Sequence, residues 1–280
     1  MAKIIDGKSI ADEIYRELRK EVSTLKDKPG LAVVLVGDDP ASIVYVRNKE
    51  RACKRLGLNY KLLKFPQSIS RDELLSSIRT LNEDREINGI IVQMPLPKHL
   101  DAFDVVSNID PLKDVDGLHP DNLGRLSSGK PRIIPCTPLG IIELLKRENI
   151  DIRGKNAVIV GRSNLVGKPL FHLLLSLDAT VTVCHSKTID LKRETSRADI
   201  LVCAVGVPRL ITVDMVKEGA IVIDVGINKV EDKLVGDVDF ERVKEIATFI
   251  TPVPGGVGPM TVAMLMKNVI TAYRLQKGKV

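Results

Sequence analysis

Aromatic side chains are scarce in this chain of 280 residues, which has no Trp and only 3% Phe, Trp and Tyr together. Proteins that bind single-stranded nucleic acid stack its bases on aromatic rings. The formal net charge of +6 is compatible with nucleic acid and equally with small anionic ligands. Because aromatic platforms and any recognised nucleic-acid-binding motif are missing, we do not expect a nucleic-acid partner.

Long apolar runs, targeting signals and paired cysteines are missing as well. The apolar runs are far shorter than the roughly 20 residues that span a bilayer, and the first residues lack the architecture of a signal peptide. The four cysteines form no CxxC pair and the four histidines have no zinc-ligand spacing. We therefore expect a cytoplasmic protein with reduced thiols, no membrane partner and no metal.

What the chain does have is an alternation of helical and extended patterns. Its strand-like segments are short and almost entirely apolar, which is typical of a parallel sheet covered by helices on both faces. In the first half the predicted helices lie near residues 9–25, 42–56 and 71–81, and the predicted strands near residues 31–36, 60–65 and 89–94.

A second α/β region follows a stretch with three prolines at residues 131–138, which has the composition of a linker. Its strands are predicted at residues 157–160, 180–184, 200–204, 220–224 and 247–251, and a last helix at about 261–276. The sequence thus predicts two α/β domains, residues 1–136 and residues 137–261, with the segment 262–280 returning to the first domain.

The segment from Gly161 to Gly167 stands where a dinucleotide-binding turn belongs, between a strand and a helix. Gly161 would make the tight turn, Ser163 replaces the second glycine of the usual fingerprint, and Gly167 would allow close packing. The helix N-terminus would offer N–H groups to a phosphate. Because the spacing is GxSxxxG, the turn by itself is nearly as compatible with an ordinary strand–turn–helix.

The next strand ends in Cys184-His185-Ser186-Lys187 and carries no acidic residue. Sites for NAD usually have an acid there that binds the ribose 2′-hydroxyl. Arg162, beside the turn, together with His185 and Ser186, instead favours the 2′-phosphate of NADP. The alternative is that His185 and Lys187 are ordinary surface residues.

Polar residues with possible acid–base roles cluster in the first half. Tyr45 and Lys49 lie four apart on one predicted helix and share a face, and a lysine in a cleft can lose its proton more easily. Gln93 ends a strand before two prolines. Asp114 and Asp116 follow in a turn-rich segment, where they could bind a metal or accept hydrogen bonds from a heterocycle.

The segment Thr251–Thr261 holds three prolines and three glycines immediately before the last helix. Prolines fix the backbone, whereas glycines let another group approach it closely. This composition fits either a rigid connector or the floor of a ligand site, and its place suggests the seam between the two domains.

Together these motifs resemble the bifunctional methylenetetrahydrofolate dehydrogenase/methenyltetrahydrofolate cyclohydrolase family along essentially the whole chain. Each motif is modest alone, but their ordered combination is specific. The matching segments are Tyr45-Val-x-x-Lys49, Gly89-Ile-Ile-Val-Gln-x-Pro-Leu-Pro97, Lys113-Asp-Val-Asp-Gly-x-His-Pro120, Pro135-Cys-Thr-Pro-x-Gly140, Gly161-Arg-Ser-x-x-Val-Gly167, His185-Ser186, Ile223-Asp-Val-Gly-Ile-Asn228, Gly236-Asp-Val-Asp239 and the segment Thr251–Thr261.

The resemblance implies a role for each matching residue. Lys49 would be the catalytic lysine with Gln93 beside it, Tyr45 would pack against the folate, and Asp116 would hydrogen-bond its pterin ring. The implied NADP contacts are Gly161, Arg162, Ser163, His185, Ser186 and Ile227. The implied further substrate contacts are Pro254, Gly255 and Gly256.

The implied reaction is the NADP-dependent oxidation of 5,10-methylenetetrahydrofolate, followed by hydrolysis of the 5,10-methenyl product to 10-formyltetrahydrofolate. The implied fold has two α/β domains around a cleft: a folate-binding domain (1–136 plus 262–280) and a Rossmann-type NADP-binding domain (137–261). A homodimer is the implied assembly. The runner-up is another two-domain NADP-dependent dehydrogenase, similar to shikimate dehydrogenase, which leaves Tyr45, Lys49, Gln93 and Asp116 without a joint explanation.

Overall fold

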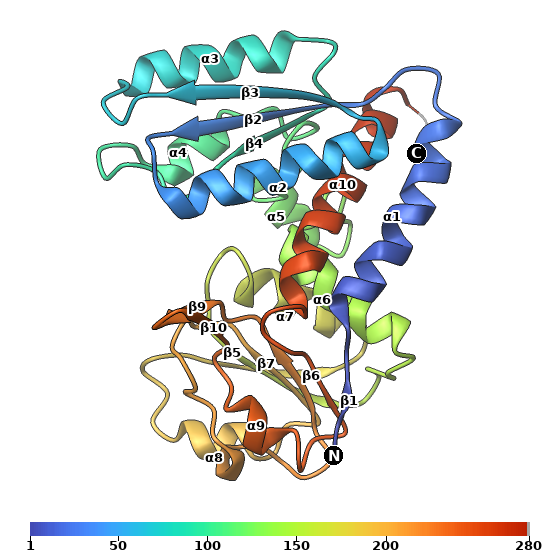
Figure 1. The fold of residues 1–280 in the computed structure, drawn as a ribbon, viewed down its shortest axis with the longest axis vertical. Coiled ribbons are helices and arrows are strands. Elements are labelled where there is room, and N and C mark those ends of the chain that lie inside the picture. Colours follow the sequence, from blue (N-terminus) through green and yellow to red (C-terminus); the bar gives the residue numbers. More distant parts are fainter. Residues whose placement is uncertain (279–280) are drawn as a thin grey trace. The chain divides into compact units, whose positions relative to one another are not determined.

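The computed structural model describes residues 1–278 and divides into two compact units, each of which is described by itself (Figure 1). The Lys49 unit comprises Glu13–Cys136 and the chain from Val262 onward. The Gly161 unit comprises Met1–Asp12 and Thr137–Thr261. Within residues 1–278 no helix has both the length and the apolar character needed to cross a bilayer.

The Lys49 unit is built on a parallel three-stranded sheet with the order β3-β2-β4. The central strand is buried along its whole length, as expected for a strand covered on both faces. Figure 1 shows α2 and α3 on opposite faces of this sheet. These elements span β2 (Gly30–Val36), β3 (Asn59–Phe65), β4 (Gly89–Val92), α2 (Pro40–Leu56) and α3 (Arg71–Glu83).

Further helices complete the Lys49 unit: α1 (Gly7–Ser23), α4 (Ala102–Ser107), α5 (Pro120–Ser127) and α10 (Val257–Gln276). Helices α1 and α10 begin in the Gly161 unit, and their later residues belong to the Lys49 unit. The end of α10 is fixed by side-chain amides: Gln276 Nε2 donates to the Asn88 carbonyl at 2.8 Å, and Asn88 Nδ2 donates to Gln276 Oε1 at 3.0 Å. The last helix is thereby tied to the residue that precedes β4.

The Gly161 unit contains a six-stranded, fully parallel sheet with the order β1-β11-β8-β7-β5-β6. Its strand order reverses at β5, whose neighbours are the next strand in sequence and the one after it, as in a Rossmann fold. The strands are β1 (Lys3–Ile4), β5 (Asn156–Val160), β6 (Thr180–Cys184), β7 (Ile200–Cys203), β8 (Ile221–Asp224) and β11 (Phe249–Ile250).

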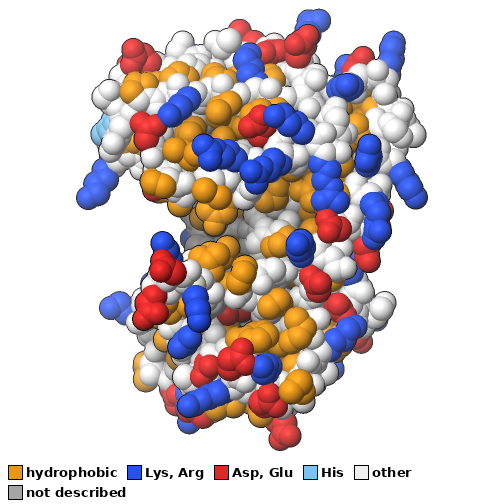
Figure 2. All heavy atoms as spheres, in the orientation of Figure 1, with side chains coloured by type: hydrophobic (Ala, Val, Ile, Leu, Met, Phe, Trp, Pro, Cys, Tyr) orange, Lys and Arg blue, Asp and Glu red, His pale blue; other side chains and the backbone are white. Residues whose placement is uncertain are grey.

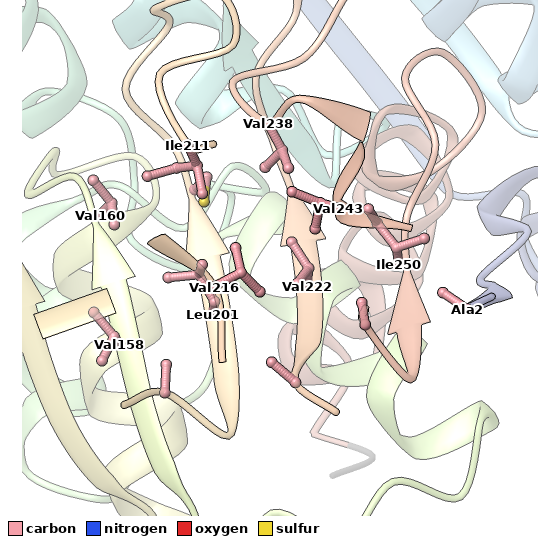
Figure 3. Close-up of a cluster of buried hydrophobic side chains, with 14 of the residues drawn as sticks. Ala2, Val158, Val160, Leu201, Ile211, Val216, Val222, Val238, Val243 and Ile250 are labelled. Carbon is pink, nitrogen blue, oxygen red and sulfur yellow. The ribbon is translucent and has the colours of Figure 1, made fainter. Parts of the chain in front are cut away.

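Short helices and one hairpin complete this unit. The helices are α6 (Cys136–Arg147), α7 (Gly167–Ser176), α8 (Leu191–Thr195), the 3-10 turn Val213–Met215 and α9 (Phe240–Val243), and the antiparallel hairpin is β9 (Asn228–Val230) with β10 (Lys233–Val235). The hydrophobic core of the Gly161 unit extends across its six-stranded sheet. Figure 3 shows Val158, Leu201, Val222 and Ile250 on the adjacent strands β5, β7, β8 and β11, with Ala2 beyond the last.

The N-terminal residues depart from the predicted domain division. Residues 1–12 were expected with the first domain, but they cluster with the Gly161 unit. The reason is backbone pairing: Lys3 and Ile4 form β1 parallel to β11, and the fully buried Ile5 donates its N–H to the Ile250 carbonyl at 2.8 Å. The predicted α/β class and the Rossmann-type second sheet are confirmed.

The positive charge of the chain is partly explained by α2. Figure 2 shows basic side chains along the outer face of this helix, with acidic side chains among them. Lys54 pairs with Glu50 at 2.7 Å, and the Arg55 guanidinium lies 4.2 Å from the centre of the Tyr15 ring. This surface is a solvated helix face with internal partners.

Candidate active site

Helix α2 places Lys49 on its buried face. Asp39 caps the helix by accepting the Ser42 N–H at 2.8 Å, and Gly57 ends it in the left-handed conformation. The buried positions Ser42, Val46, Lys49, Cys53 and Leu56 follow the helical repeat. Lys49 is only 9% exposed, which is unusual for a lysine without a carboxylate in direct contact.

Gln93 is the hydrogen-bond partner of Lys49. It follows β4, and its backbone N–H still donates to the Val34 carbonyl at 2.8 Å, so the sheet fixes its position. Lys49 Nζ donates to Gln93 Oε1 at 2.5 Å, while Gln93 Nε2 donates to the Met94 carbonyl at 2.7 Å. The second bond turns the amide oxygen toward the lysine. A neutral acceptor is thereby presented to the amine, which can donate in either protonation state.

Burial lowers the pKa of Lys49 below its ordinary value, because the charged ammonium loses its hydration. The negative charge of Asp116 acts in the opposite direction. The resulting lysine gives up its proton more readily than a surface lysine, which is the property required of a group that both accepts and returns protons.

Two aspartates in the segment between α4 and α5 have different environments. Asp114 is buried, and its carboxylate accepts the N–H groups of Gly117 at 3.1 Å and His119 at 2.7 Å and the Asn122 amide at 2.9 Å. The hydrogen bonds that the Asp114 carboxylate accepts therefore all serve this turn. Asp116 is half-buried and lies near the Cys136 thiol, which donates to the Val115 carbonyl at 3.3 Å. Asp116 is the acid of this pair that retains free acceptor positions.

Burial raises the pKa of Asp116, the charge of nearby Lys49 lowers it, and the charge of Asp114 raises it. Burial also raises the pKa of Cys136 well above its ordinary value, so this residue stays a neutral thiol. Within residues 1–278 no group of three or more His, Cys, Asp or Glu could hold a metal ion.

Asn268 of α10 holds the Asp116 turn in place, and the sequence analysis missed it. Its Nδ2 lies 2.9 Å from the Val115 carbonyl, 2.8 Å from the Ile134 carbonyl and 3.5 Å from Cys136 Sγ. It is 3% exposed. The only sequence signal was a polar residue among the apolar side chains of a helix, which does not reveal its partners.

Tyr45 lies one helical turn before Lys49, as the spacing predicts, but in a different environment. Its side chain is 43% exposed, whereas that of Lys49 is buried. An exposed ring beside a buried lysine offers a flat apolar surface that a planar heterocycle could cover.

The Gly161 unit contains the predicted cofactor turn after β5. Gly161 has a φ of +127°, and a Cβ there would overlap the Ala204 carbonyl at the end of β7. A Cβ at Gly167 would overlap the Gly161 carbonyl. Both positions therefore require glycine, and the backbone at the switch point between β5 and β7 stays bare, as a bound diphosphate requires.

Ser163 and Arg162 lie exposed on this turn. Ser163 Oγ accepts the Val166 N–H at 3.1 Å, and its carbonyl accepts the Lys168 N–H at 3.1 Å. These bonds shape the turn that leads into α7. The N-terminal N–H groups of this ten-residue helix are suited to an anion.

His185 and Ser186 follow β6. His185 Nδ1 accepts the Lys187 N–H at 3.1 Å, and its own N–H donates to Thr188 Oγ1 at 2.9 Å. A neutral His185 with this bond carries its proton on Nε2. Ser186 and Lys187 are exposed at the same end of the strand.

Ile227 and the segment before α10 also lie in the Gly161 unit. Ile227 is 48% exposed and its Cδ1 lies 3.7 Å from where a Cβ at Gly258 would be. The Val253–Pro254 bond is cis, and Gly255 has a φ of +107°. A Cβ at Gly256 would come 2.6 Å from the Pro252 carbonyl. Gly255 thus has a conformational reason to be glycine, and Gly256 has a steric one.

The predicted residues fall into two sets. Lys49, Gln93 and Asp116 come together in the Lys49 unit, with Tyr45 one helical turn away. The Gly161 unit holds the predicted cofactor contacts Gly161, Arg162, Ser163, His185, Ser186 and Ile227, and also the predicted substrate contacts Pro254, Gly255 and Gly256.

Comparison with known proteins identifies the family. Residues 5–116 match the family model described as tetrahydrofolate dehydrogenase/cyclohydrolase, catalytic domain, and residues 135–277 match the NAD(P)-binding domain of the same family. This chain belongs to the tetrahydrofolate dehydrogenase/cyclohydrolase family. The resemblance drawn from the motifs and the predicted class of enzyme are confirmed.

Individual relatives agree over nearly the full length. The bifunctional protein FolD of Halothermothrix orenii is 59% identical, with 98% of this chain and 99% of the relative covered. The crystal structure of the bifunctional enzyme FolD from Campylobacter jejuni is 47% identical and has a TM-score of 0.97, with 99% of this chain and all of that chain covered.

A third relative, the FolD of Trypanosoma brucei, was solved with an NADP cofactor and an inhibitor; it is 39% identical over 99% of this chain and 98% of that chain, with a TM-score of 0.94. The alternative, a dehydrogenase similar to shikimate dehydrogenase, has much weaker support. The shikimate dehydrogenase of Aquifex aeolicus is 15% identical with a TM-score of 0.51 over 90% of this chain and 93% of that chain. That likeness concerns the fold alone.

Proposed function

We propose that this chain oxidises 5,10-methylenetetrahydrofolate with NADP⁺ and hydrolyses the resulting 5,10-methenyltetrahydrofolate to 10-formyltetrahydrofolate, with Lys49 as the proton-transfer group. The observation that carries the proposal is the buried Lys49 amine, hydrogen-bonded to Gln93 at 2.5 Å and lying in the field of Asp116. In this reading the Lys49 unit binds folate and the Gly161 unit binds NADP.

The hydrolysis step requires proton transfer. Water adds to the methenyl carbon, a C–N bond breaks, and the released nitrogen takes up a proton. We assign Lys49 to accept and return these protons, with its pKa lowered by burial. Gln93 holds the amine in place. Acid–base help of this kind is worth roughly 10²–10⁴-fold in rate.

The oxidation step requires alignment more than proton chemistry. NADP⁺ supplies the hydride acceptor at C4 of its nicotinamide ring. We assign Tyr45 to pack against the folate and Asp116 to accept hydrogen bonds from its pterin ring. Asp116 has free acceptor positions for this role, whereas the carboxylate of Asp114 already accepts hydrogen bonds within its own turn. Pro254, Gly255 and Gly256 are proposed as further substrate contacts.

The residues of the Gly161 turn fit a dinucleotide. The bare backbone at Gly161 and Gly167 and the start of α7 would receive the diphosphate, and Ser163 and Ile227 would contact the cofactor. We propose NADP over NAD because β6 ends without an acid and is followed by His185 and Ser186, with Arg162 on the neighbouring turn.

Two further assignments follow from the chemistry and the family resemblance. Cys53, Cys136, Cys184 and Cys203 are free and buried, which agrees with a protein of the reducing cytoplasm. We propose a homodimer, as the family resemblance implies, and a folate as the small-molecule substrate.

The test is an assay at two wavelengths with methylenetetrahydrofolate, run with NADP⁺ and then with NAD⁺. We expect NADPH and methenyl-folate to form, methenyl-folate to decay to 10-formyltetrahydrofolate, and NAD⁺ to react more slowly. Shikimate should not be oxidised. Oxidation of shikimate but not of methylenetetrahydrofolate would overturn the proposal.

A further inference from the structure

Two buried aspartates of the Gly161 unit have no part in the proposed chemistry. Asp224 ends β8 and is 3% exposed, and Asp237 follows β10 and is 0% exposed. A buried carboxylate is costly unless it is fully hydrogen-bonded. The hydrogen-bond partners of Asp224 and Asp237 therefore show which segments the two carboxylates hold in place.

Asp237 joins two loops. Its Oδ2 accepts the N–H groups of Val205 at 2.7 Å and Gly206 at 3.0 Å, and its Oδ1 accepts Asn228 Nδ2 at 2.9 Å. Val205 and Gly206 follow β7, and Asn228 is next to Ile227 in the segment after β8. One side chain thus fixes both segments.

Asp224 supports Asp237 from the strand below. Its Oδ1 accepts the N–H groups of Gly226 at 3.0 Å and Asp237 at 2.9 Å, and its Oδ2 accepts the Val238 N–H at 2.9 Å. The Asp224 N–H donates to Thr251 Oγ1 at 2.7 Å, which extends the network to the segment after β11.

The packing leaves no room for variation around these carboxylates. A Cβ at Gly226 would overlap the Asp237 carboxylate, and a Cβ at Gly236 would overlap the Asp224 carboxylate. The two glycines thus let the backbone close directly on the acids. Such close construction fixes the positions of the attached loops.

These loops lie where a cofactor would be received. In a parallel α/β sheet ligands bind beyond the carboxyl ends of the strands, at the point where the strand order reverses. The loops after β7, β8 and β11 start from the same ends as the Gly161 turn after β5. Ala204, which touches Gly161, directly precedes Val205.

We propose that Asp237, supported by Asp224, is a positioning residue for NADP: it fixes the loops after β7 and β8 that enclose the nicotinamide half of the cofactor. The inference rests on the proposed NADP-dependent function. Neither aspartate touches the reacting atoms in this assignment, because every oxygen already accepts hydrogen bonds from the protein.

The test compares Asp237→Ala with Asp237→Asn. Asparagine keeps an oxygen toward Val205 and Gly206, and its NH₂ can face Asn228, whose amide can rotate to present its own oxygen. Alanine removes every hydrogen bond of the Asp237 side chain. We expect the alanine variant to raise both the KM and the directly measured Kd for NADP⁺ by about tenfold or more, and the asparagine variant to stay within about threefold of the wild type.

The cyclohydrolase reaction provides the internal control, since it starts from methenyl-folate and consumes no NADP⁺. We expect its kcat/KM to stay within about twofold in both variants. A parallel loss of both activities in Asp237→Ala, an unchanged Kd for NADP⁺, or a failure of asparagine to restore binding would each overturn the inference.

If Asp237→Ala does not fold, the variant Asn228→Ala tests the same inference. It removes only the amide contact, and we expect a smaller rise in the Kd for NADP⁺ with normal hydrolysis of methenyl-folate; no rise would overturn the inference. Failure of the proposed function itself is distinguishable, because the wild-type chain would then neither bind NADP⁺ nor turn over methylenetetrahydrofolate.

Discussion

Two clusters of acidic residues, one in each unit, use their carboxylates in different ways. Asp224 and Asp237 are enclosed in the Gly161 unit, and each oxygen accepts hydrogen bonds from nearby N–H groups. Asp116 of the Lys49 unit is half-buried, and the charge of Lys49 acts on its carboxylate. The first cluster stabilises loops, and the second keeps capacity for a ligand.

The same contrast occurs within a single turn, between Asp114 and Asp116. The carboxylate oxygens of Asp114 accept hydrogen bonds from Gly117, His119 and Asn122. These bonds shape the turn that presents Asp116. A buried acid is thus a candidate for chemistry when its hydrogen-bonding capacity is incomplete, and a structural element when that capacity is exhausted. The following predictions test that distinction.

The largest effect is expected for Lys49→Met. Methionine fills a similar volume without an amine, so hydrolysis of methenyl-folate should fall by roughly 10²–10⁴-fold. The matched control is Lys54→Met on the same helix, whose lysine is exposed and pairs with Glu50; it should hydrolyse normally. Near-normal hydrolysis by Lys49→Met would remove Lys49 from the chemistry.

The next effect is expected for Arg162→Ala at the cofactor turn. Loss of a charged contact to a 2′-phosphate costs about 1.5–3 kcal/mol, so the Kd for NADP⁺ should rise by more than tenfold while the Kd for NAD⁺ changes little. Arg153→Ala, which removes an exposed pair with Asp178 in the same unit, serves as the control. Equal losses for both cofactors would contradict the assignment.

A smaller effect, mainly on stability, is expected for Asn268→Ala. The change removes the amide donor from the carbonyls of both Val115 and Ile134. Val115 keeps the Cys136 thiol as a donor, whereas the loss at Ile134 costs about 1–3 kcal/mol. Urea unfolding should measure the loss, and the KM for folate should rise because the Asp116 turn is less well held. A destabilised variant with an unchanged KM would show that Asn268 acts on the fold alone.

The smallest effect is a shift in pH dependence in Asp116→Asn. The charge of Asp116 raises the pKa of Lys49, in opposition to burial, so removing that charge should lower this pKa further. If neutral Lys49 accepts the proton, kcat for hydrolysis rises with pH through this pKa, and the midpoint should move to lower pH in the variant. A midpoint moved to higher pH would show that the two groups are not coupled in this way.

Much of the fold could be predicted from local patterns. The apolar runs at residues 31–36 and 89–94 correspond to β2 and β4, and the glycine spacing of residues 161–167 corresponds to the turn after β5. Such patterns are predictable because buried strands must be apolar and tight turns need glycine. The φ of +107° at Gly255 supplies a backbone reason for glycine at that position.

Other features had no local signal. Strand β1 has only two residues, and its membership of the Gly161 unit depends on pairing with a strand some 245 residues away. Asn268 and Asp237 are polar residues whose hydrogen-bond partners are distant in sequence. Nothing in a short window distinguishes them from solvated side chains.

The sequence by itself determined the alternation of helices and strands, the two bare glycine turns and the ordered motifs that identify the family, because these depend on short-range geometry and composition. Only the tertiary structure decided which lysines are buried, Lys49 among them, and which acids remain available. Those outcomes depend on where distant backbone N–H groups and apolar surfaces meet, and burial and hydrogen bonding then set the chemistry of Lys49, Asp116 and Asp237.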